Sequence, residues 1–240
     1  FMMSIKQLPP HLVNQIAAGE VIERPASVVK ELLENSLDAG AGTIWIEVEQ
    51  GGIKRIRVRD DGQGIPPNEL PLAVARHATS KINAIEDLQR VTSLGFRGEA
   101  LPSIASVSHL DIASCINADE SGYRYQVHGG EAIDPSPVPH PPGTSVEVKD
   151  LFYNVPARRK FLKSERTEYS HIDQLVKKLA LGHFDTAFEF RHNQRQVFRV
   201  PSADSLEAMT TRVGKICGTA FVNNALFVDQ SAAGLRLWGW

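Results

Sequence analysis

The chain has 240 residues, of which 42% are hydrophobic and 22% charged, and its formal net charge is −2. This length fits one large domain or one domain with part of another, and the apolar fraction supports a sizeable core. The near-neutral charge provides no global attraction to nucleic acid or membranes, so any DNA contact requires a local basic patch. Two cysteines suit a reducing compartment, and the sequence has neither zinc-ligand spacing nor an apolar run of transmembrane length. We therefore expect a cytoplasmic protein with no membrane partner.

The most informative stretch is residues 25–40, PASVVKELLENSLDAG. Proline at the first helical position and glycine just past the last turn are helix start and stop signals. Apolar residues at helical spacing predict a buried face, and Glu31, Asn35 and Asp38 lie together on the opposite half. A carboxylate and a carboxamide therefore point the same way, one turn apart. For the helix alone, a solvated polar face with an i,i+4 ion pair is the alternative interpretation.

A β-hairpin is predicted over 43–58, where apolar residues alternate on both sides of a Gly-Gly turn. Its second strand runs directly into Asp60-Asp61-Gly62-Gln63-Gly64. Glycines at this spacing permit positive φ and a close approach of the backbone to a ligand. An acid at the end of a strand can accept a hydrogen bond from a ligand N–H group. An acidic turn whose glycines serve geometry alone is the alternative.

A third signal lies between residues 76 and 101, where the polar run RHATSK precedes LGFRGEAL. The second run opens a predicted helix. Glycines just before a helix N-terminus expose backbone N–H groups at the positive end of the helix dipole, which is a ready anion site. A surface loop capped by Gly98 is the alternative. The phosphate interpretation is favoured because an acid–amide helix and an Asp-Gly turn come earlier in the chain.

The rest of the chain reads as short elements. Periodicity predicts strands at 109–114, 123–127, 144–148, 186–191 and 195–200, and helices at 68–77, 157–162, 167–181 and 206–216. An irregular loop is expected over 134–143, whose five prolines cannot donate to a sheet ladder. Residues 201–205 are the best candidate linker. One helix and two strands, at 226–229 and 235–240, then follow, too little for a domain. We expect a first domain over 1–200, with 201–240 as the linker and truncated start of a second.

In this order, the features resemble the superfamily of DNA gyrase, the ninety-kilodalton heat-shock chaperone, histidine kinases and MutL (GHKL). The chain is most similar to the MutL family of mismatch-repair ATPases, from about residue 5 through residue 240. The runs that carry this resemblance are NQIAAGE at 14–20, RPASVVK at 24–30, ENSLDAG at 34–40, ARHATSK at 75–81, GFRGEAL at 95–101 and FYNVPARRKF at 152–161.

The resemblance implies an α+β fold, the GHKL ATPase fold. It is an α/β sandwich with a mixed, largely antiparallel sheet covered by helices on one face. ATP is expected between helices and sheet, under a mobile lid at 79–98. The truncated start of a β-rich second domain is expected to follow. In the family a lysine of that domain reaches the γ-phosphate, and the matching position would lie beyond residue 240, so we expect weak hydrolysis by this chain.

The resemblance also implies the site. Glu31 is expected to be the general base, Asn35 the Mg²⁺ ligand through its carbonyl oxygen, and Asp60 the acceptor of the adenine amino proton. The other positions implied to bind ATP are Asp38 and Ala39 on the helix, Gly62, Gly64, Ile65 and Thr144 at the adenine end, and His77, Ala78, Thr79, Ser80, Lys81, Leu94, Gly95, Phe96, Arg97, Gly98, Glu99, Ala100 and Leu101 in the lid and phosphate loop. His77 is more typical of packing or hydrogen bonding in a lid than of catalysis.

The implied function is an ATP-driven switch in mismatch repair. ATP binding would order the lid and close an N-terminal homodimer into a clamp between the mismatch-recognition protein MutS and a downstream nuclease or helicase. A basic cluster at Arg158, Arg159 and Lys160, with Lys163 and Arg166, could meet DNA weakly and without sequence preference, although most such clusters are solvated faces. The alternatives are a nucleotide-gated scaffold with incidental hydrolysis, a histidine-kinase-like phosphotransferase and a type II topoisomerase-like ATPase.

Overall fold

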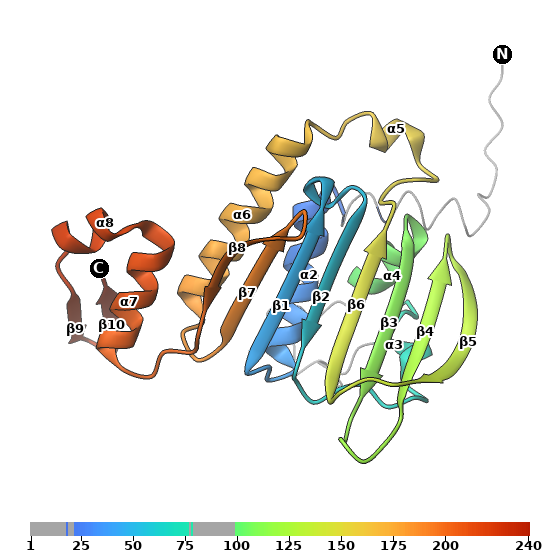
Figure 1. The fold of residues 1–240 in the computed structure, drawn as a ribbon, viewed down its shortest axis with the longest axis horizontal. Helices are drawn as coiled ribbons and strands as arrows, with labels where there is room; N and C mark the ends of the chain where they lie inside the picture. The colour runs from blue at the N-terminus through green and yellow to red at the C-terminus, as the bar shows by residue number, and fades with distance from the viewer. Residues whose placement is uncertain (1–17, 19–21, 77, 79–98) are drawn as a thin grey trace.

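The computed structural model describes residue 18, residues 22–76, residue 78 and residues 99–240 (Figure 1). Eight strands form one sheet in the order β5-β4-β3-β6-β2-β1-β7-β8, and β9 pairs with β10 in a separate sheet of two strands. The strands are β1 Thr43–Glu49, β2 Arg55–Asp60, β3 His109–Cys115, β4 Gly122–His128, β5 Glu131–Val138, β6 Gly143–Lys149, β7 Ala187–His192, β8 Arg195–Val200, β9 Val228–Ala232 and β10 Leu235–Gly239. The helices are α2 Pro25–Asp38, α3 Leu70–Ala73, α4 Ala100–Ser106, α5 Pro156–Arg159, α6 Glu165–Gly182, α7 Leu206–Cys217 and α8 Thr219–Asn224, with a 3-10 turn η1 at Gln50–Gly52.

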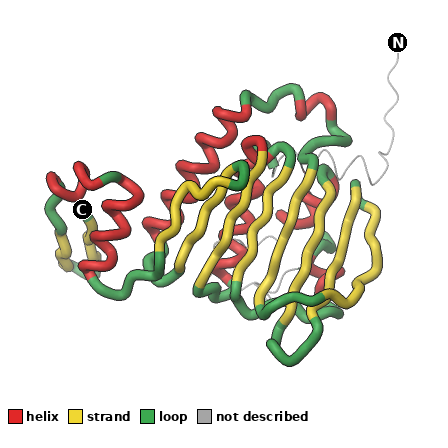
Figure 2. Tube along the Cα trace, in the orientation of Figure 1, coloured by secondary structure: helices red, strands yellow, loops and turns green. Residues whose placement is uncertain are grey.

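The large sheet is mixed, as predicted. β1 runs parallel to β7, and every other neighbouring pair in this sheet is antiparallel. The parallel pair forms because the chain leaves the sheet after β6 and crosses behind it through α6 before β7 lies beside β1 (Figure 1). α2, α4 and α6 lie on one face of the sheet, and the described part of the chain places no helix against the other (Figure 2). The predicted fold class, a mostly antiparallel sheet with helices on one face, is confirmed.

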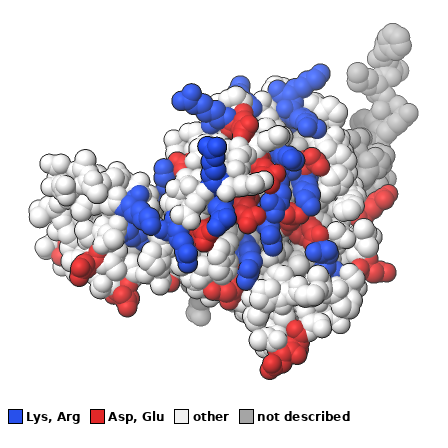
Figure 3. Space-filling model, viewed as in Figure 1, with Lys and Arg blue, Asp and Glu red and all other residues white. Residues whose placement is uncertain are grey.

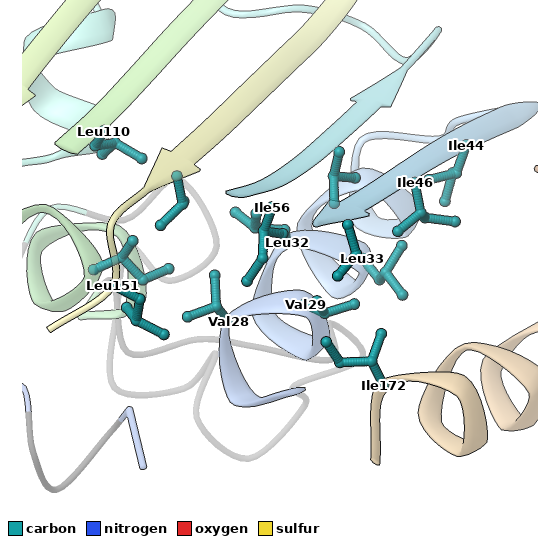
Figure 4. Packing of buried hydrophobic residues seen from close by; sticks show 14 of the residues in the cluster. Val28, Val29, Leu32, Leu33, Ile44, Ile46, Ile56, Leu110, Leu151 and Ile172 are labelled. Carbon is teal, nitrogen blue, oxygen red and sulfur yellow. The ribbon is translucent and has the colours of Figure 1, made fainter. Parts of the chain in front are cut away.

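The core lies between α2 and the middle of the sheet (Figure 4). Four apolar side chains of α2 are at most 2% exposed: Val28, Val29, Leu32 and Leu33. Alternate positions of β1 and β2 face them and are buried to the same degree: Ile44, Ile46, Val48, Ile56 and Val58. Burying one such side chain fully stabilises the fold by about 1.5–3 kcal/mol. The helical period of α2 and the period of two in the hairpin therefore converge on one interior, which fixes the helix against the strands.

Charges of both signs interleave on the open face of the sheet (Figure 3). Arg55 on β2 lies 3.2 Å from Glu47, 3.3 Å from Glu49 and 2.6 Å from Glu147. Burial raises the pKa of the Glu147 carboxyl group, but donation from the Lys149 ammonium and the Arg55 guanidinium outweighs it, so the pKa is lowered. The Arg55 and glutamate side chains are only partly buried, and ion pairs near a protein surface contribute about 0–1 kcal/mol each, so the network adds little to stability. Within the described ranges, no helix is long and apolar enough to cross a membrane.

The irregular loop predicted over 134–143 is wrong in its first half. Residues Glu131–Val138 form β5, which pairs with β4 at the edge of the sheet. An edge strand has a ladder on one side only, so proline can be accommodated there without loss of a sheet hydrogen bond. Pro137 lies opposite Tyr123, and the register shifts between Arg124 and Gln126. The prolines mark an edge here and do not exclude a strand.

Two predicted helices are shorter than expected. The helix predicted at 68–77 is α3, Leu70–Ala73, and the one predicted at 157–162 is α5, Pro156–Arg159. Each ends by tightening into hydrogen bonds between residues three apart. Val74 N–H donates to Pro71 at 3.3 Å, and Phe161 N–H donates to Arg158 at 2.9 Å. Bonds of this 3-10 type close a helix and do not propagate it. The pattern also missed α8, which follows α7 after Gly218 at a φ of 96°.

A second, smaller core lies beyond the large sheet, where α7 packs near the ends of α6 and β8. Its buried apolar members are Phe184, Ala203 and Val213. Arg212 of α7 is 2% exposed and donates to four backbone carbonyls, those of His183, Phe184, Thr186 and Pro201, at 2.8–3.2 Å. Burial lowers the pKa of Arg212 to about 10, so the guanidinium stays protonated at neutral pH. One side chain thus ties α7 to the chain on both sides of the β7–β8 hairpin.

Replacing Arg212 with methionine should destabilise the protein strongly. The substitution keeps much of the apolar volume but leaves four carbonyls without this donor, and a single orphaned buried group already costs about 1–3 kcal/mol. We expect the free energy of unfolding in urea to fall by at least about 2 kcal/mol. The matched control is Lys177→Met, which breaks the surface pair with Asp173 at 2.8 Å and should cost about 0.5 kcal/mol or less. Equal losses in the two variants would contradict a special role for Arg212.

Candidate functional site

Asp60, the last residue of β2, is the centre of the predicted site and is 5% exposed. Its Oδ2 accepts a hydrogen bond from the Ser36 hydroxyl at 2.9 Å. Its Oδ1 accepts from the backbone N–H groups of Gly62 at 3.0 Å and Thr144 at 3.3 Å. These donors belong to α2, to the turn after β2 and to the start of β6. The carboxylate therefore joins three segments that are distant in sequence.

Burial raises the pKa of Asp60, and the hydrogen bonds from Gly62, Ser36 and Thr144 oppose the rise. The neighbouring charge of Asp61 raises it further. An ionised carboxylate can accept about four hydrogen bonds. Three are accepted within the protein, which leaves about one acceptor direction for a donor outside this set. A buried, mostly satisfied acid with one direction left is suited to recognise a single N–H group.

Thr144 lies beside Asp60, as the predicted site requires, and its hydroxyl is 2.9 Å from that of Ser114. Sequence reasoning missed both Ser36 and Ser114, which are 3% and 2% exposed. A signal for each was present. Ser36 follows Leu32 by four residues on the apolar side of α2, and Ser114 follows Ile112 by two on β3. A polar side chain at a core-facing position requires a buried partner.

The glycines of the Asp-x-Gly-x-Gly turn lie against the protein's own backbone. A Cβ on Gly62 would lie 2.8 Å from the carbonyl oxygen of Ala39. Gly64 has a φ of 73°, and a Cβ there would overlap the carbonyl oxygen of Cys115. Ile65 N–H then donates to the Ser114 hydroxyl at 2.8 Å. Both glycines are thus required for the turn to seat beside α2 and β3, and a role beside a bound base stays a prediction.

The polar side of α2 is half-buried at the three predicted positions, Glu31, Asn35 and Asp38. The interpretation of this helix as carrying an i,i+4 ion pair is also correct, because Lys30 Nζ lies 3.0 Å from Glu34. The same ammonium lies 3.7 Å from Glu31, whose side chain is 26% exposed. At the helix end, the carbonyl oxygen of Ala39 accepts from Gln63 N–H at 3.1 Å. The end of α2 and the Asp60 turn are therefore locked together.

Most of the predicted phosphate loop lies outside the described residues. The predicted positions outside them are His77, Thr79, Ser80, Lys81, Leu94, Gly95, Phe96, Arg97 and Gly98. Of the remainder, Glu99 immediately precedes α4, Ala100 begins it, and Leu101 packs against the main core. Ala78 is described as a single residue between undescribed neighbours. The structure thus brings together the adenine-end positions and the α2 positions on adjoining segments.

Residues 22–154 match the family model described as histidine kinase-, DNA gyrase B- and HSP90-like ATPase. The chain belongs to this ATPase family. It is also 33% identical to the Aquifex aeolicus MutL ATPase domain complexed with ADP. The two structures superpose with a TM-score of 0.64, and the match covers 87% of this chain and 72% of that one. The same domain carrying a K252N mutation is 32% identical at a TM-score of 0.70, over 91% of this chain and 75% of that one. Within this superfamily, the chain belongs to the MutL family.

Curated relatives of this MutL-type chain carry the name DNA mismatch repair protein MutL. That of Cellvibrio japonicus is 55% identical over the whole of this chain and 38% of its own length. That of Pseudomonas aeruginosa is 57% identical over 98% of this chain and 37% of its own length. The chain therefore spans less than two fifths of the curated relatives that it matches.

The residues of this MutL domain fit a magnesium ion that is completed by a phosphate ligand. Mg²⁺ takes oxygen donors and usually keeps waters, with one or two protein oxygens and substrate phosphates around it. Asn35 offers a carboxamide oxygen one turn from Glu31 on a half-buried face. Among the described residues no group of three or more His, Cys, Asp or Glu side chains forms a protein cage for a metal. A single amide oxygen would suit a cation held chiefly by the phosphates of a nucleotide.

Replacing Asp60 with asparagine should not destabilise the protein at neutral pH. Because burial raises the pKa of Asp60, the folded protein binds a proton there more tightly than the unfolded chain, so this group favours folding more at acidic pH. Asparagine removes the buried charge and keeps an acceptor for Gly62 and Thr144. We expect the variant's stability relative to wild type to be greater at about pH 7 than at about pH 4, measured by urea unfolding. Asp61→Asn, at an exposed position, is the control. It removes only the smaller contribution of a neighbouring charge to the pKa of Asp60, so its pH trend should be weaker, and an equal trend in both variants would contradict the argument.

Proposed function

We propose that this chain binds ATP and hydrolyses it, as the N-terminal region of a mismatch-repair protein of the MutL type. The observation that carries the proposal is the buried Asp60 carboxylate, held by three protein donors with one acceptor direction left. The 6-amino group of adenine is a donor of the required kind. The ADP bound by the Aquifex aeolicus relative supports the same ligand class. Gly62, Gly64, Ile65 and Thr144 then surround the base.

The proposed chemistry is the attack of water on the γ-phosphorus of ATP. Glu31 accepts a proton from the water as it attacks, the bond from the γ-phosphorus to the bridging oxygen breaks, and ADP leaves. Asn35 would hold the nucleotide's metal through its side-chain oxygen. When bound, Mg²⁺ neutralises phosphate charge. The half-buried face that holds Glu31 and Asn35 on successive turns of a rigid helix supports this division of roles.

The same proposal extends to the whole protein. ATP binding closes a homodimer of N-terminal regions, and slow hydrolysis reopens it, in the cytoplasm, between MutS and a downstream nuclease or helicase. Weak, non-specific DNA contact at the basic residues around α5 belongs to this picture. We propose a domain boundary between residues 200 and 201, and the end of the large sheet at Val200 supports it. The names of the curated relatives support the repair role.

A nucleotide-gated scaffold with incidental hydrolysis, or a topoisomerase-like ATPase, is the competing function. A protein that only binds nucleotide needs no acid one turn before Asn35. The presence of Glu31 on that face favours hydrolysis as part of the function. Relatives named MutL match over 98–100% of this chain, which favours the mismatch-repair role.

Asp60→Asn should weaken the binding of ADP. The new amide can present a donor where the adenine amino group also donates, and the loss of a buried hydrogen bond of this kind costs roughly 1–3 kcal/mol, or about five- to 150-fold in affinity. Isothermal titration calorimetry measures the change. The matched control is Asp61→Asn, because the Asp61 carboxylate accepts from Thr43 N–H at 2.7 Å, a donor outside the set that holds Asp60. An ADP affinity for Asp60→Asn equal to that of the control would remove the assigned role.

In the full-length protein, Glu31→Gln should separate binding from hydrolysis. Loss of a general base typically slows turnover by roughly 10²–10⁴-fold, while the affinity for ADP should stay close to wild type because the adenine end is untouched. Phosphate release and calorimetry measure the two effects. Glu34→Gln makes the same change three residues later on the same helix, at a side chain that pairs with Lys30, and should leave turnover within a few-fold. Similar turnover in the two variants would show that Glu31 is not the base.

A further inference from the structure

Ser114 on β3 joins three segments at the adenine end of the site. It is 2% exposed, and its single hydroxyl has three polar neighbours. The N–H group of Ile65 donates to it at 2.8 Å, the carbonyl oxygen of Gly143 lies at 2.9 Å, and the hydroxyl of Thr144 lies at 2.9 Å. The partners come from the turn after Gly64 and from the first two residues of β6. No role follows for Ser114 from the family resemblance.

The direction of each hydrogen bond follows from the number of protons available. A serine hydroxyl has one proton and two acceptor directions. The carbonyl of Gly143 can only accept, so the proton of Ser114 is donated there. The N–H group of Ile65 takes one acceptor direction of Ser114, and the other is left for Thr144. Thr144 must therefore be the donor in the contact between the two hydroxyls.

Thr144 has only one hydroxyl proton, and this arrangement uses it. Toward any further group, Thr144 Oγ1 can only accept a hydrogen bond. Asp60 beside it, hydrogen-bonded to the Thr144 N–H group, is likewise an acceptor while ionised. The two side chains therefore present acceptors alone. If Ser114 were absent, the Thr144 proton would be free to turn toward a ligand.

We propose that Ser114 is a positioning residue that makes the Thr144 hydroxyl an acceptor and thereby sharpens selection of a 6-amino purine over a 6-oxo purine. The inference rests on the proposed nucleotide function of this site. An amino group places donors against Asp60 and Thr144. A 6-oxo group places an acceptor against two acceptors, and such a mismatch of buried polar groups is costly. Ser114 acts through Thr144 and does not itself touch the base.

The test compares the dissociation constants of ADP and inosine 5′-diphosphate (IDP), whose base has a 6-oxo group, by calorimetry. Wild type should prefer ADP. Ser114→Ala frees the Thr144 proton and should lower the IDP-to-ADP ratio of dissociation constants by roughly two- to tenfold, the worth of one neutral hydrogen bond. The matched control is Ser108→Ala, because Ser108 is equally buried but donates to the carbonyl of Ile104 at 2.7 Å. A general loss of stability would weaken the binding of both nucleotides in both variants, whereas only Ser114→Ala should change the IDP-to-ADP ratio.

A double-mutant cycle identifies the route. Thr144→Val removes the oxygen on which Ser114 acts and should lower the ratio by itself, and adding Ser114→Ala should then change nothing further. If Ser114→Ala fails to fold, Thr144→Val still tests the inference. An unchanged IDP-to-ADP ratio in Thr144→Val would show that the Thr144 hydroxyl does not distinguish the two bases. An unchanged ratio in folded Ser114→Ala, or additive effects in the double variant, overturns the inference. If wild type binds neither nucleotide, the proposed function fails as well, whereas binding of ADP with an unchanged ratio in Ser114→Ala removes only the role of Ser114.

Discussion

The arrangement of the site depends on the burial of one carboxylate. Removing Asp60 from water is costly unless donors replace the lost hydration. Ser36, Gly62 and Thr144 provide those donors. Because they come from a helix, a turn and a distant strand, the folded chain must bring all three together before the charge can be accommodated. Satisfying this one group therefore orients α2 against the sheet at the position where its polar face is needed.

The burial of the Asp60 carboxylate lowers the stability of the folded protein but favours recognition of a ligand N–H group. The pKa of Asp60 stays above its ordinary value even with three donors. A ligand N–H group would supply a further donor and would favour the ionised form, so part of the cost of folding is recovered only when ligand binds. A hydrophobic residue at this position would pack without such a cost but would recognise nothing. A buried acid whose pKa stays raised is what a proposed binding site for an N–H donor requires.

Local patterns were sufficient to predict the elements that hold the site. The helix from Pro25, the hairpin over β1 and β2, and β3, β4 and β6 all follow from short-range periodicity, and so does the position of Asp60 at a strand end. β5 was missed because the prohibition on proline in a sheet does not apply to an edge. Whether a strand lies at the edge or in the centre is a property of the assembled sheet. β5 is an edge strand because β6, the next strand in the chain, pairs with β3 and not with β5.

The residues whose roles the sequence did not predict were missed for a different reason. Ser36, Ser114 and Arg212 are polar side chains with partners far away in sequence: Ser36 bonds a residue 24 positions on, and Arg212 bonds a carbonyl 29 positions back. Periodicity marks such positions as core-facing but says nothing of what they meet. A polar residue on an apolar face requires a partner, so it predicts that a polar interaction exists without naming it.

The Asp-x-Gly-x-Gly turn shows why a motif can be strict for two reasons at once. A side chain at Gly62 would press on Ala39 at the end of α2, and one at Gly64 would overlap Cys115 at the end of β3. Both contacts exist before any ligand is bound. The turn must lie this close to α2 because Ser36 donates to one carboxylate oxygen of Asp60 and Gly62 to the other. It must lie close to β3 because the Ile65 N–H group donates to the Ser114 hydroxyl. The glycines thus follow from the requirement to bury and satisfy Asp60, and the proposed site for a base adjoins the turn that meets this requirement.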